Sequence, residues 1–163
     1  IHLRWAPQAP GLAAPPPREE NALSSELPLA RVSVIEMSDE YHISAAAVGS
    51  MLADLGARVT KLERPQRPDP WKRTCKKLYD DLNGKKFVQV VNYTHVGGQA
   101  GNHDCQQGQA ALYRTLADTT MLVTNLPSQA LDMWGFGVSR LRSMFPHLIV
   151  VLISTWGCDE EAR

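Results

Sequence analysis

The sequence has 163 residues, 44% of them apolar, and its 17 basic and 17 acidic residues give a formal net charge of zero. This length and composition suffice for one domain with a hydrophobic core. A neutral chain offers no electrostatic reason to bind nucleic acid or an anionic membrane. The sequence has no apolar run of about 18 residues, so we predict no direct membrane span. The three cysteines lie at wide and irregular spacing, which favours free thiols over a disulfide framework or a paired metal site.

Residues 1–27 are rich in proline and alanine, which predicts an extended, polyproline-like N-terminal arm. The apolar residues Ile1, Leu3 and Trp5 are suited to docking on a neighbouring subunit, and the alternative is a disordered linker. The sequence begins without methionine, and Arg4 among Ala and Pro residues is typical of the end of an organellar presequence. We therefore expect a mitochondrial or plastid location, with the cytoplasm as the alternative.

Residues 32–65 have the pattern of a strand, a helix and a second strand. Apolar residues at 32–35 predict the first strand, Ser38 and Asp39 are good N-cap residues for the helix that follows, and residues 59–63 resume an extended pattern. A unit of this spacing predicts two parallel strands joined by a right-handed crossover. In such sheets, ligands bind at the carboxyl edge of the strands.

The rest of the chain repeats this alternation with two interruptions. Residues 66–86, rich in Pro, Lys and Asp, predict an irregular loop over the carboxyl edge. The glycine-rich stretch 92–109 holds His95 and His103, but their spacing fits no recognised metal motif, so we expect no metal site. The remaining patterns predict strands at 87–91, 121–123 and 147–153, and helices at 109–118, 128–133 and 139–144.

The last predicted strand is almost continuously apolar from Leu148 to Ile153, as expected of a strand that helices bury on both faces. Together these patterns predict an α/β fold, a Rossmann-like parallel sheet with helices on both faces. This domain is expected to occupy residues 28–163 and to follow the N-terminal arm.

Three segments carry a resemblance to a known family. MLADLGARVTKLERP, the later LNGKK and the tail TNLPSQALDMWGFGVSRLRSMFPHLIVVLISTWG resemble, in order and spacing, the N-terminal half of the class III CoA-transferases (CaiB/BaiF-like). This family includes formyl-CoA transferase, carnitine CoA-transferase and α-methylacyl-CoA racemase. The resemblance covers residues 27–157, and it implies CoA as the ligand.

The resemblance also implies that the segment after Glu63 and an Asn-x-x-Lys motif help to form the CoA pocket, with Asp69 and Pro70 as further matching residues. Arginine and lysine suit phosphate oxygens well. The alternative is a solvated basic loop, balanced by neighbouring aspartates. The candidate CoA-binding residues, interpreted as a vestigial site, are Arg64, Lys72, Arg73, Asn83 and Lys86, with Lys85 as a further phosphate contact.

The sequence departs from the family at three places. Residues 44–46 read Ser-Ala-Ala where the family has Ala-Gly-Pro, and Pro127 aligns with an arginine that the resemblance implies contacts CoA. The aspartate that forms covalent acyl intermediates in the family is expected beyond Arg163. We therefore assign no catalytic residue to these 163 residues.

These departures favour a non-catalytic, pseudoenzyme role as a structural or accessory subunit of a larger organellar assembly, such as a membrane-associated respiratory, photosynthetic or ribosomal complex. The expected partners are protein subunits that contact the N-terminal arm and an exposed edge of the sheet. Two alternatives stay open. The chain is either the N-terminal part of an active class III CoA-transferase or racemase, or a CoA-binding module without catalysis.

Overall fold

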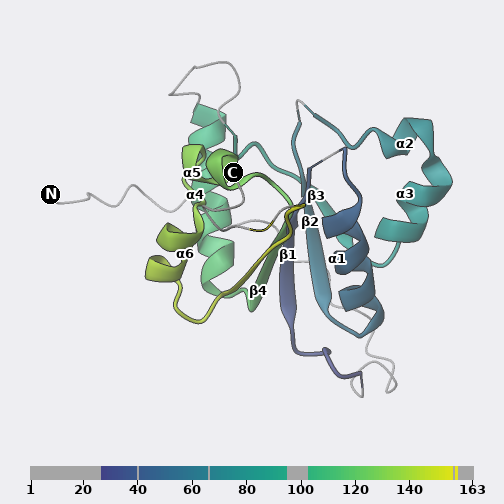
Figure 1. Ribbon diagram of the computed structural model, residues 1–163, viewed down its shortest axis with the longest axis horizontal. Coiled ribbons are helices and arrows are strands. Elements are labelled where there is room, and N and C mark those ends of the chain that lie inside the picture. Colours follow the sequence, from purple (N-terminus) through teal and green to yellow (C-terminus); the bar gives the residue numbers. More distant parts are fainter. Residues whose placement is uncertain (1–26, 40, 66, 95–102, 156, 158–163) are drawn as a thin grey trace, which may run out of the picture.

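The computed structural model describes residues 27–39, 41–65, 67–94, 103–155 and 157. Its centre is a five-stranded sheet in which all neighbouring strands run parallel, in the order β3-β2-β1-β4-β5 (Figure 1). The expected α/β fold with a parallel sheet is confirmed, whereas the expected N-terminal arm lies, except for Leu27, outside the described residues. The strands are β1 Ser33–Met37, β2 Arg58–Glu63, β3 Phe87–Val90, β4 Met121–Thr124 and β5 Ile149–Leu152.

Helices cover both faces of the sheet. The helices α1, α2 and α3 flank one face, and α4, α5 and α6 flank the other (Figure 1). None of the helices in the described residues is long and apolar enough to cross a membrane. Their bounds are α1 Ser44–Asp54, α2 Trp71–Thr74, α3 Lys76–Asn83, α4 His103–Ala117, α5 Ser128–Met133 and α6 Val138–Met144.

The face under α4, α5 and α6 is packed with apolar side chains. Tyr93 lies in this cluster, with its ring centroid 6.2 Å from those of Trp134 and Phe136 in edge-on contacts. Burial of so many apolar groups is the main stabilising contribution to a fold of this size. The strands and helices contribute, among others, Ile35, Met37, Leu62, Leu112, Leu116, Leu122, Leu131 and Leu141.

The opposite face, under α1, changes character along its strands. Near the amino edge, Val34 and Val59 are register partners and lie buried with Ala53 of α1. Two residues further along, the register partners are Glu36 and Lys61, also buried. Because side chains on one face of a strand recur every second residue, the apolar row gives way to a charged row towards the carboxyl edge.

The prediction of an irregular loop at residues 66–86 is wrong, because this segment contains α2 and α3. In α3, Lys76 lies 2.5 Å from Asp80 and Lys77 lies 2.7 Å from Asp81, both at the i,i+4 spacing that supports a helix. The abundance of Lys and Asp therefore reflects helical ion pairs on an exposed face.

The expected N-cap of the first helix at Ser38 and Asp39 is also wrong, since α1 begins five residues later with Ile43 before it and no side-chain cap. The carboxylate of Asp39 instead accepts a hydrogen bond from the backbone N–H of Tyr41 at 2.7 Å. Such a turn is a common alternative use of Asp. It lengthens the connection between β1 and α1.

The helix expected at 109–118 begins earlier, at His103. The glycine-rich composition concealed this first part of α4. Gly108 is needed there because a Cβ atom would lie 2.0 Å from the carbonyl oxygen of Asn92. Among the described residues, no group of three or more His, Cys, Asp or Glu is arranged to hold a metal, and His95 lies outside them.

Candidate functional site

The strand order reverses between β1 and β4, so the carboxyl ends of these strands are where ligands bind in open parallel sheets. Asn125, directly after β4, joins the two sides of this crevice. Its Oδ1 accepts from the backbone N–H of Asp39 at 2.7 Å, and its Nδ2 donates to Ser44 Oγ at 3.1 Å and to the carbonyl of His42 at 3.2 Å. These bonds occupy the crevice itself, and the hollows lie beside it, over β1 and β2.

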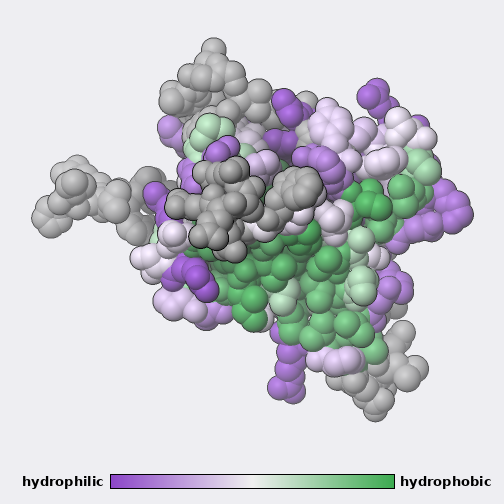
Figure 2. Space-filling model, viewed as in Figure 1, coloured by the Kyte–Doolittle hydropathy of each residue, from purple (hydrophilic) through white to green (hydrophobic). Residues whose placement is uncertain are grey.

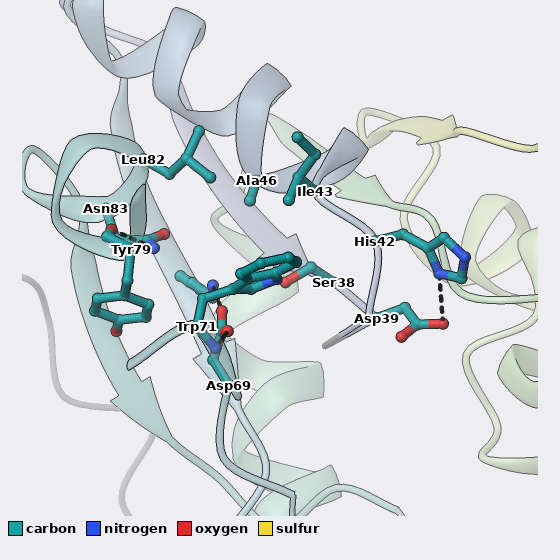
Figure 3. Close-up of a pocket in the computed structure, with 11 residues that line it drawn as sticks. Ser38, Asp39, His42, Ile43, Ala46, Asp69, Trp71, Tyr79, Leu82 and Asn83 are labelled. Carbon is teal, nitrogen blue, oxygen red and sulfur yellow. Dashed lines mark hydrogen bonds and ion pairs between the residues drawn. The ribbon is translucent and has the colours of Figure 1, made fainter. Parts of the chain in front are cut away.

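The first hollow is shallow and lies between the N-terminus of α1 and the segment that carries α2 and α3 (Figure 3). Trp71 and Tyr79 give it an aromatic wall, Ile43 and Leu82 add apolar surface, and polar groups line its base. A pocket of mainly apolar walls with a few polar groups is typical of ligand sites. Its remaining lining residues are Ser38, Asp39, His42, Ala46, Lys61, Asp69 and Asn83.

Lys61 and Asp69 form a buried ion pair at the base of this hollow. Lys61 Nζ lies 2.6 Å from Asp69 Oδ2, and their side chains are 2% and 9% exposed. Asp69 also accepts the backbone N–H of Trp71 at 2.9 Å, which fixes the start of α2. The Lys61 ammonium lies 5.3 Å from the centroid of the Tyr79 ring. Pairing and hydrogen bonding compensate the cost of burying the two charges.

Glu63, the last residue of β2, is held from two helices. Lys72 Nζ of α2 lies 2.6 Å from Glu63 Oε2, and the Tyr79 hydroxyl of α3 donates to Glu63 Oε1 at 2.8 Å. Burial raises the pKa of the Tyr79 phenol well above its usual value, and the bond to Glu63 adds to this shift. The two bonds to Glu63 tie α2 and α3 to the sheet.

Lys86, before β3, is the most enclosed of the basic residues at this end of the sheet. Its Nζ donates to Glu36 Oε2 at 2.8 Å, to the carbonyl of Ala46 at 2.7 Å and to Asn83 Oδ1 at 3.2 Å. These three acceptors use all the donors of an ammonium group. Burial lowers the pKa of Lys86, and the nearby Glu36 carboxylate opposes this shift. Gly49 makes room for the pair, because a Cβ there would lie 2.1 Å from Glu36 Oε2.

A second shallow hollow adjoins the first and shares Ser38, Lys61 and Asp69 with it. Arg64, immediately after β2, is 8% exposed, and its guanidinium carbon lies 5.4 Å from the centroid of the Trp134 ring. Stacking on an aromatic ring suits a planar guanidinium. The other lining residues are Leu62, Glu63, Arg67 and Tyr93.

The structure brings only some of the predicted CoA-binding residues together. Asn83 and Lys86 share a hydrogen bond beside the first hollow, and Lys72 lies nearby on Glu63. Arg64 lines the second hollow. Arg73 is exposed on α2 and lines neither hollow, and Lys85 pairs on the surface with Asp54 at 2.6 Å.

Two positions where the sequence departs from the expected family pattern also lie near this edge. Ser44 is the first residue of α1 and accepts the bond from Asn125, while Ala46 lines the first hollow. Pro127 is an exposed residue just before α5.

Sequence reasoning missed the buried charges Glu36 and Lys61 and the role of Tyr79. A signal was present, because both charges are flanked by apolar or β-branched residues, Glu36 directly after the first predicted strand and Lys61 in the middle of the second. A charge at such a position needs a partner of opposite sign. The sequence did not reveal the partners, which are Asp69, just before α2, and Lys86, just after α3.

Known proteins are similar to this chain in sequence. Residues 29–163 match the model of CoA-transferase family III. The chain is 28% identical over 130 residues to a succinyl-CoA–D-citramalate CoA-transferase of Chloroflexus aurantiacus, covering 80% of this chain and 31% of that protein. It is 30% identical over 132 residues to a cinnamoyl-CoA:phenyllactate CoA-transferase of Clostridium sporogenes, covering 77% of this chain and 30% of that protein.

Solved structures agree on the fold. The protein Rv3272 of Mycobacterium tuberculosis aligns with a TM-score of 0.64 at 20% identity, over 81% of this chain and 35% of that one. A CAIB/BAIF family protein of Brucella suis aligns with a TM-score of 0.63 at 24% identity, over 83% and 35%. The chain thus spans about a third of the length of these proteins. From residue 29 onwards, it belongs to CoA-transferase family III.

Proposed function

We propose that this domain binds CoA at its carboxyl edge and that the acyl-transfer chemistry of the family is carried by residues outside those described. The observation that carries the second part is the state of the edge carboxylates. Glu36, Glu63 and Asp69 are each held by a lysine within 2.8 Å. Asp39 accepts from the backbone of Tyr41. A carboxylate that attacks a thioester must present a free oxygen to the substrate. Glu63 and Asp69 have both oxygens bonded, and the unbonded Oε1 of Glu36 is buried.

The charges around the second hollow support the binding part of the proposal. Lys61, Arg64 and Arg67 face two carboxylates there, which leaves one positive charge in excess. Guanidinium groups are good partners for phosphate oxygens. The aromatic wall of the adjoining first hollow, Trp71 and Tyr79, suits stacking against a planar base. The two hollows together thus offer contacts for the phosphates and the adenine of CoA.

A calorimetric titration of CoA into the protein tests this proposal. We expect binding, and we expect Arg64→Ala to weaken it by roughly 10-fold or more, since a hydrogen bond to a charged group contributes about 1.5–3 kcal/mol. Arg73→Ala is the matched control, because Arg73 is exposed and lines neither hollow. Absence of CoA binding, or equal losses in the two variants, would contradict the proposal.

A second candidate function is the structural or accessory subunit. The observation that favours it is that Lys86 and Lys72, two of the expected phosphate contacts, are engaged with internal carboxylates. This function predicts no CoA binding and stable co-purification with other subunits. Recovery of the protein from mitochondria or plastids in such a complex would support it, and the same experiment tests the predicted location.

The third candidate is a part of an active CoA-transferase. It is favoured by the relatives above, which are CoA-transferases about three times as long as the matched region. A transferase assay on the longest natural form of the protein tests this candidate: transfer would support it, and CoA binding without transfer would support a binding module.

A further inference from the structure

Among the described residues, the helices on the α1 face of the sheet cover β1 and β2 but not β5. Across one level of the sheet, the side chains are Val59 on β2, Val34 on β1, Met121 on β4 and Ile149 on β5. Val59 and Val34 are 2% and 1% exposed under α1, Met121 is half-buried, and Ile149 is 52% exposed. The cover that α1 provides therefore ends over β4.

The uncovered surface is continuous and apolar. Figure 2 shows a broad hydrophobic area in the middle of the molecule, over the sheet and the flank of α1. We call this surface the apolar strip. It consists of Met121, Ile149, Val151 and Ile153 from the sheet side and Val48, Leu52 and Leu55 from the flank of α1.

The size of the apolar strip argues for a tethered occupant. Two strands about 4.8 Å apart and five residues long present roughly 10 Å by 17 Å, so the strip with its helical flank covers a few hundred Å². A stable interface between separate proteins buries about 800 Å² on each partner. A segment of the same chain needs far less area, because its effective concentration is in the millimolar range.

The chain enters the described domain at the border of the apolar strip. The backbone N–H of Leu29 donates to the carbonyl of Leu55 at 3.0 Å, and Leu29 and Val32 pack on the same cluster as the strip. Leu27 lies against Gly56, where an added Cβ would be 2.7 Å from the Cβ of Leu27. Residues 1–26 are therefore attached beside the surface that the described helices leave uncovered.

The composition of residues 1–17 fits an apolar surface. Arg4 is their only residue with a formal charge, and Ile1, Leu3, Trp5 and Leu12 are large and apolar. Their prolines bring no backbone N–H that would lose water on such a surface. An extended chain rises about 3.1 Å per residue, so the segment between Leu27 and residue 1 can reach every part of a strip about 17 Å long.

We propose that residues 1–17 lie on the apolar strip of their own chain, with Leu3 and Trp5 among the side chains that cover Ile149 and Val151. The proposal concerns the opposite half of the sheet from the CoA-binding edge and is independent of it. In this proposal the N-terminal arm docks on its own chain and not on a neighbouring subunit.

Limited trypsin digestion of the full chain tests the proposal through the Arg4–Trp5 bond, followed by mass spectrometry. We expect Ile149→Lys to speed cleavage after Arg4 at least about fivefold, because a charge there removes the burial that protects the bond. The control is Met133→Lys on α5, where a methionine 73% exposed lies outside the strip. Equal cleavage rates in the wild type and both variants would overturn the proposal.

Methyl NMR gives a second reading that does not depend on a substitution in the sheet. Removal of residues 1–17 should shift the methyl resonances of Ile149 and Ile153 and leave that of Ile35, on the other face, in place. Contacts between Trp5 and Ile149 should persist on dilution. If they appear only between differently labelled copies, or if the shifts do not change, the cis docking is wrong.

Discussion

The two faces of the sheet bury different kinds of side chain. Under α4, α5 and α6, the side chains are almost all apolar, and the aromatic rings of Tyr93 and Phe136 fill the centre. Under α1, α2 and α3, three lysine–carboxylate pairs lie at the carboxyl end and an apolar strip is left open at β4 and β5. One face therefore contributes stability by transfer of apolar groups, and the other holds charges whose burial requires matched partners.

The two faces also differ in how far they tolerate substitution. A purely apolar face can be built from many combinations of residues, whereas each charge of the α1 face depends on one specific partner. The face with specific partners borders both hollows, and Leu62 and Tyr93 of the apolar face line the second one as well. Four sets of substitutions can break or sharpen this comparison, beginning with the largest expected effect.

Glu36→Gln should destabilise the protein most. It leaves the Lys86 ammonium buried without a charged partner, and breaking a fully buried pair costs about 3–5 kcal/mol. Urea unfolding followed by circular dichroism measures the change. In the double variant Glu36→Leu and Lys86→Met, most of the loss should be recovered. A loss below about 1 kcal/mol for Glu36→Gln would show that the pair is not buried as described.

Leu122→Ala on the apolar face should cost about 2–5 kcal/mol, since the side chain is fully buried and its loss leaves a cavity. Ile149→Ala on the neighbouring strand β5 is the matched change in the apolar strip. It should cost less than about 1 kcal/mol, because Ile149 is 52% exposed. Thermal unfolding of both variants checks the difference, and similar losses would mean that the strip is as well covered as the core.

Tyr79→Phe removes the hydroxyl bond to Glu63 and should cost about 1 kcal/mol at neutral pH. The pKa of Tyr79 is raised in the folded state from the ordinary value of 10.0. Above pH 10, the unfolded chain therefore loses this proton first, and the contribution of Tyr79 to stability falls as pH rises. Unfolding curves from pH 8 to 11 should fall less steeply for Tyr79→Phe than for the wild type, and parallel curves would contradict the assignment.

Lys85→Ala should have the smallest effect, below about 0.5 kcal/mol. Lys85 and its partner Asp54 are 69% and 53% exposed, so solvent and salt screen their attraction. The neighbouring Lys86 makes this a direct comparison of an exposed and a buried lysine in consecutive positions. If the loss for Lys85→Ala in urea unfolding approached that of Glu36→Gln, burial would not be the factor that separates them.

The sequence predicted the strands well because their apolar and β-branched runs are short and sharply bounded. Parallel pairing followed from the alternation with helices, and the strand at the end of the chain was recognised from its continuous apolar run, which includes Ile149–Leu152. The helices were less predictable where polar residues form them. In α3 the decisive signal is the i,i+4 spacing of Lys76 with Asp80, which composition alone conceals.

The candidate site was only partly predictable, for a similar reason. The sequence identified which residues are basic, and Arg64 and Asn83 do line the hollows. It did not reveal that the Lys86 ammonium would be occupied by Glu36, 50 positions away. Pairing over such separations depends on the register of β1 against β2 and on the approach of α3, which no local pattern encodes.

The most direct test of the central claim is an NMR titration of the isotope-labelled protein with CoA. We predict saturable shifts at the carboxyl edge, centred on Ser38, Arg64 and Tyr79, with Ile149 and Arg73 unaffected. Shifts confined to other surfaces, or none at millimolar CoA, would contradict a CoA-binding edge and leave the structural role as the better explanation of the buried ion pairs.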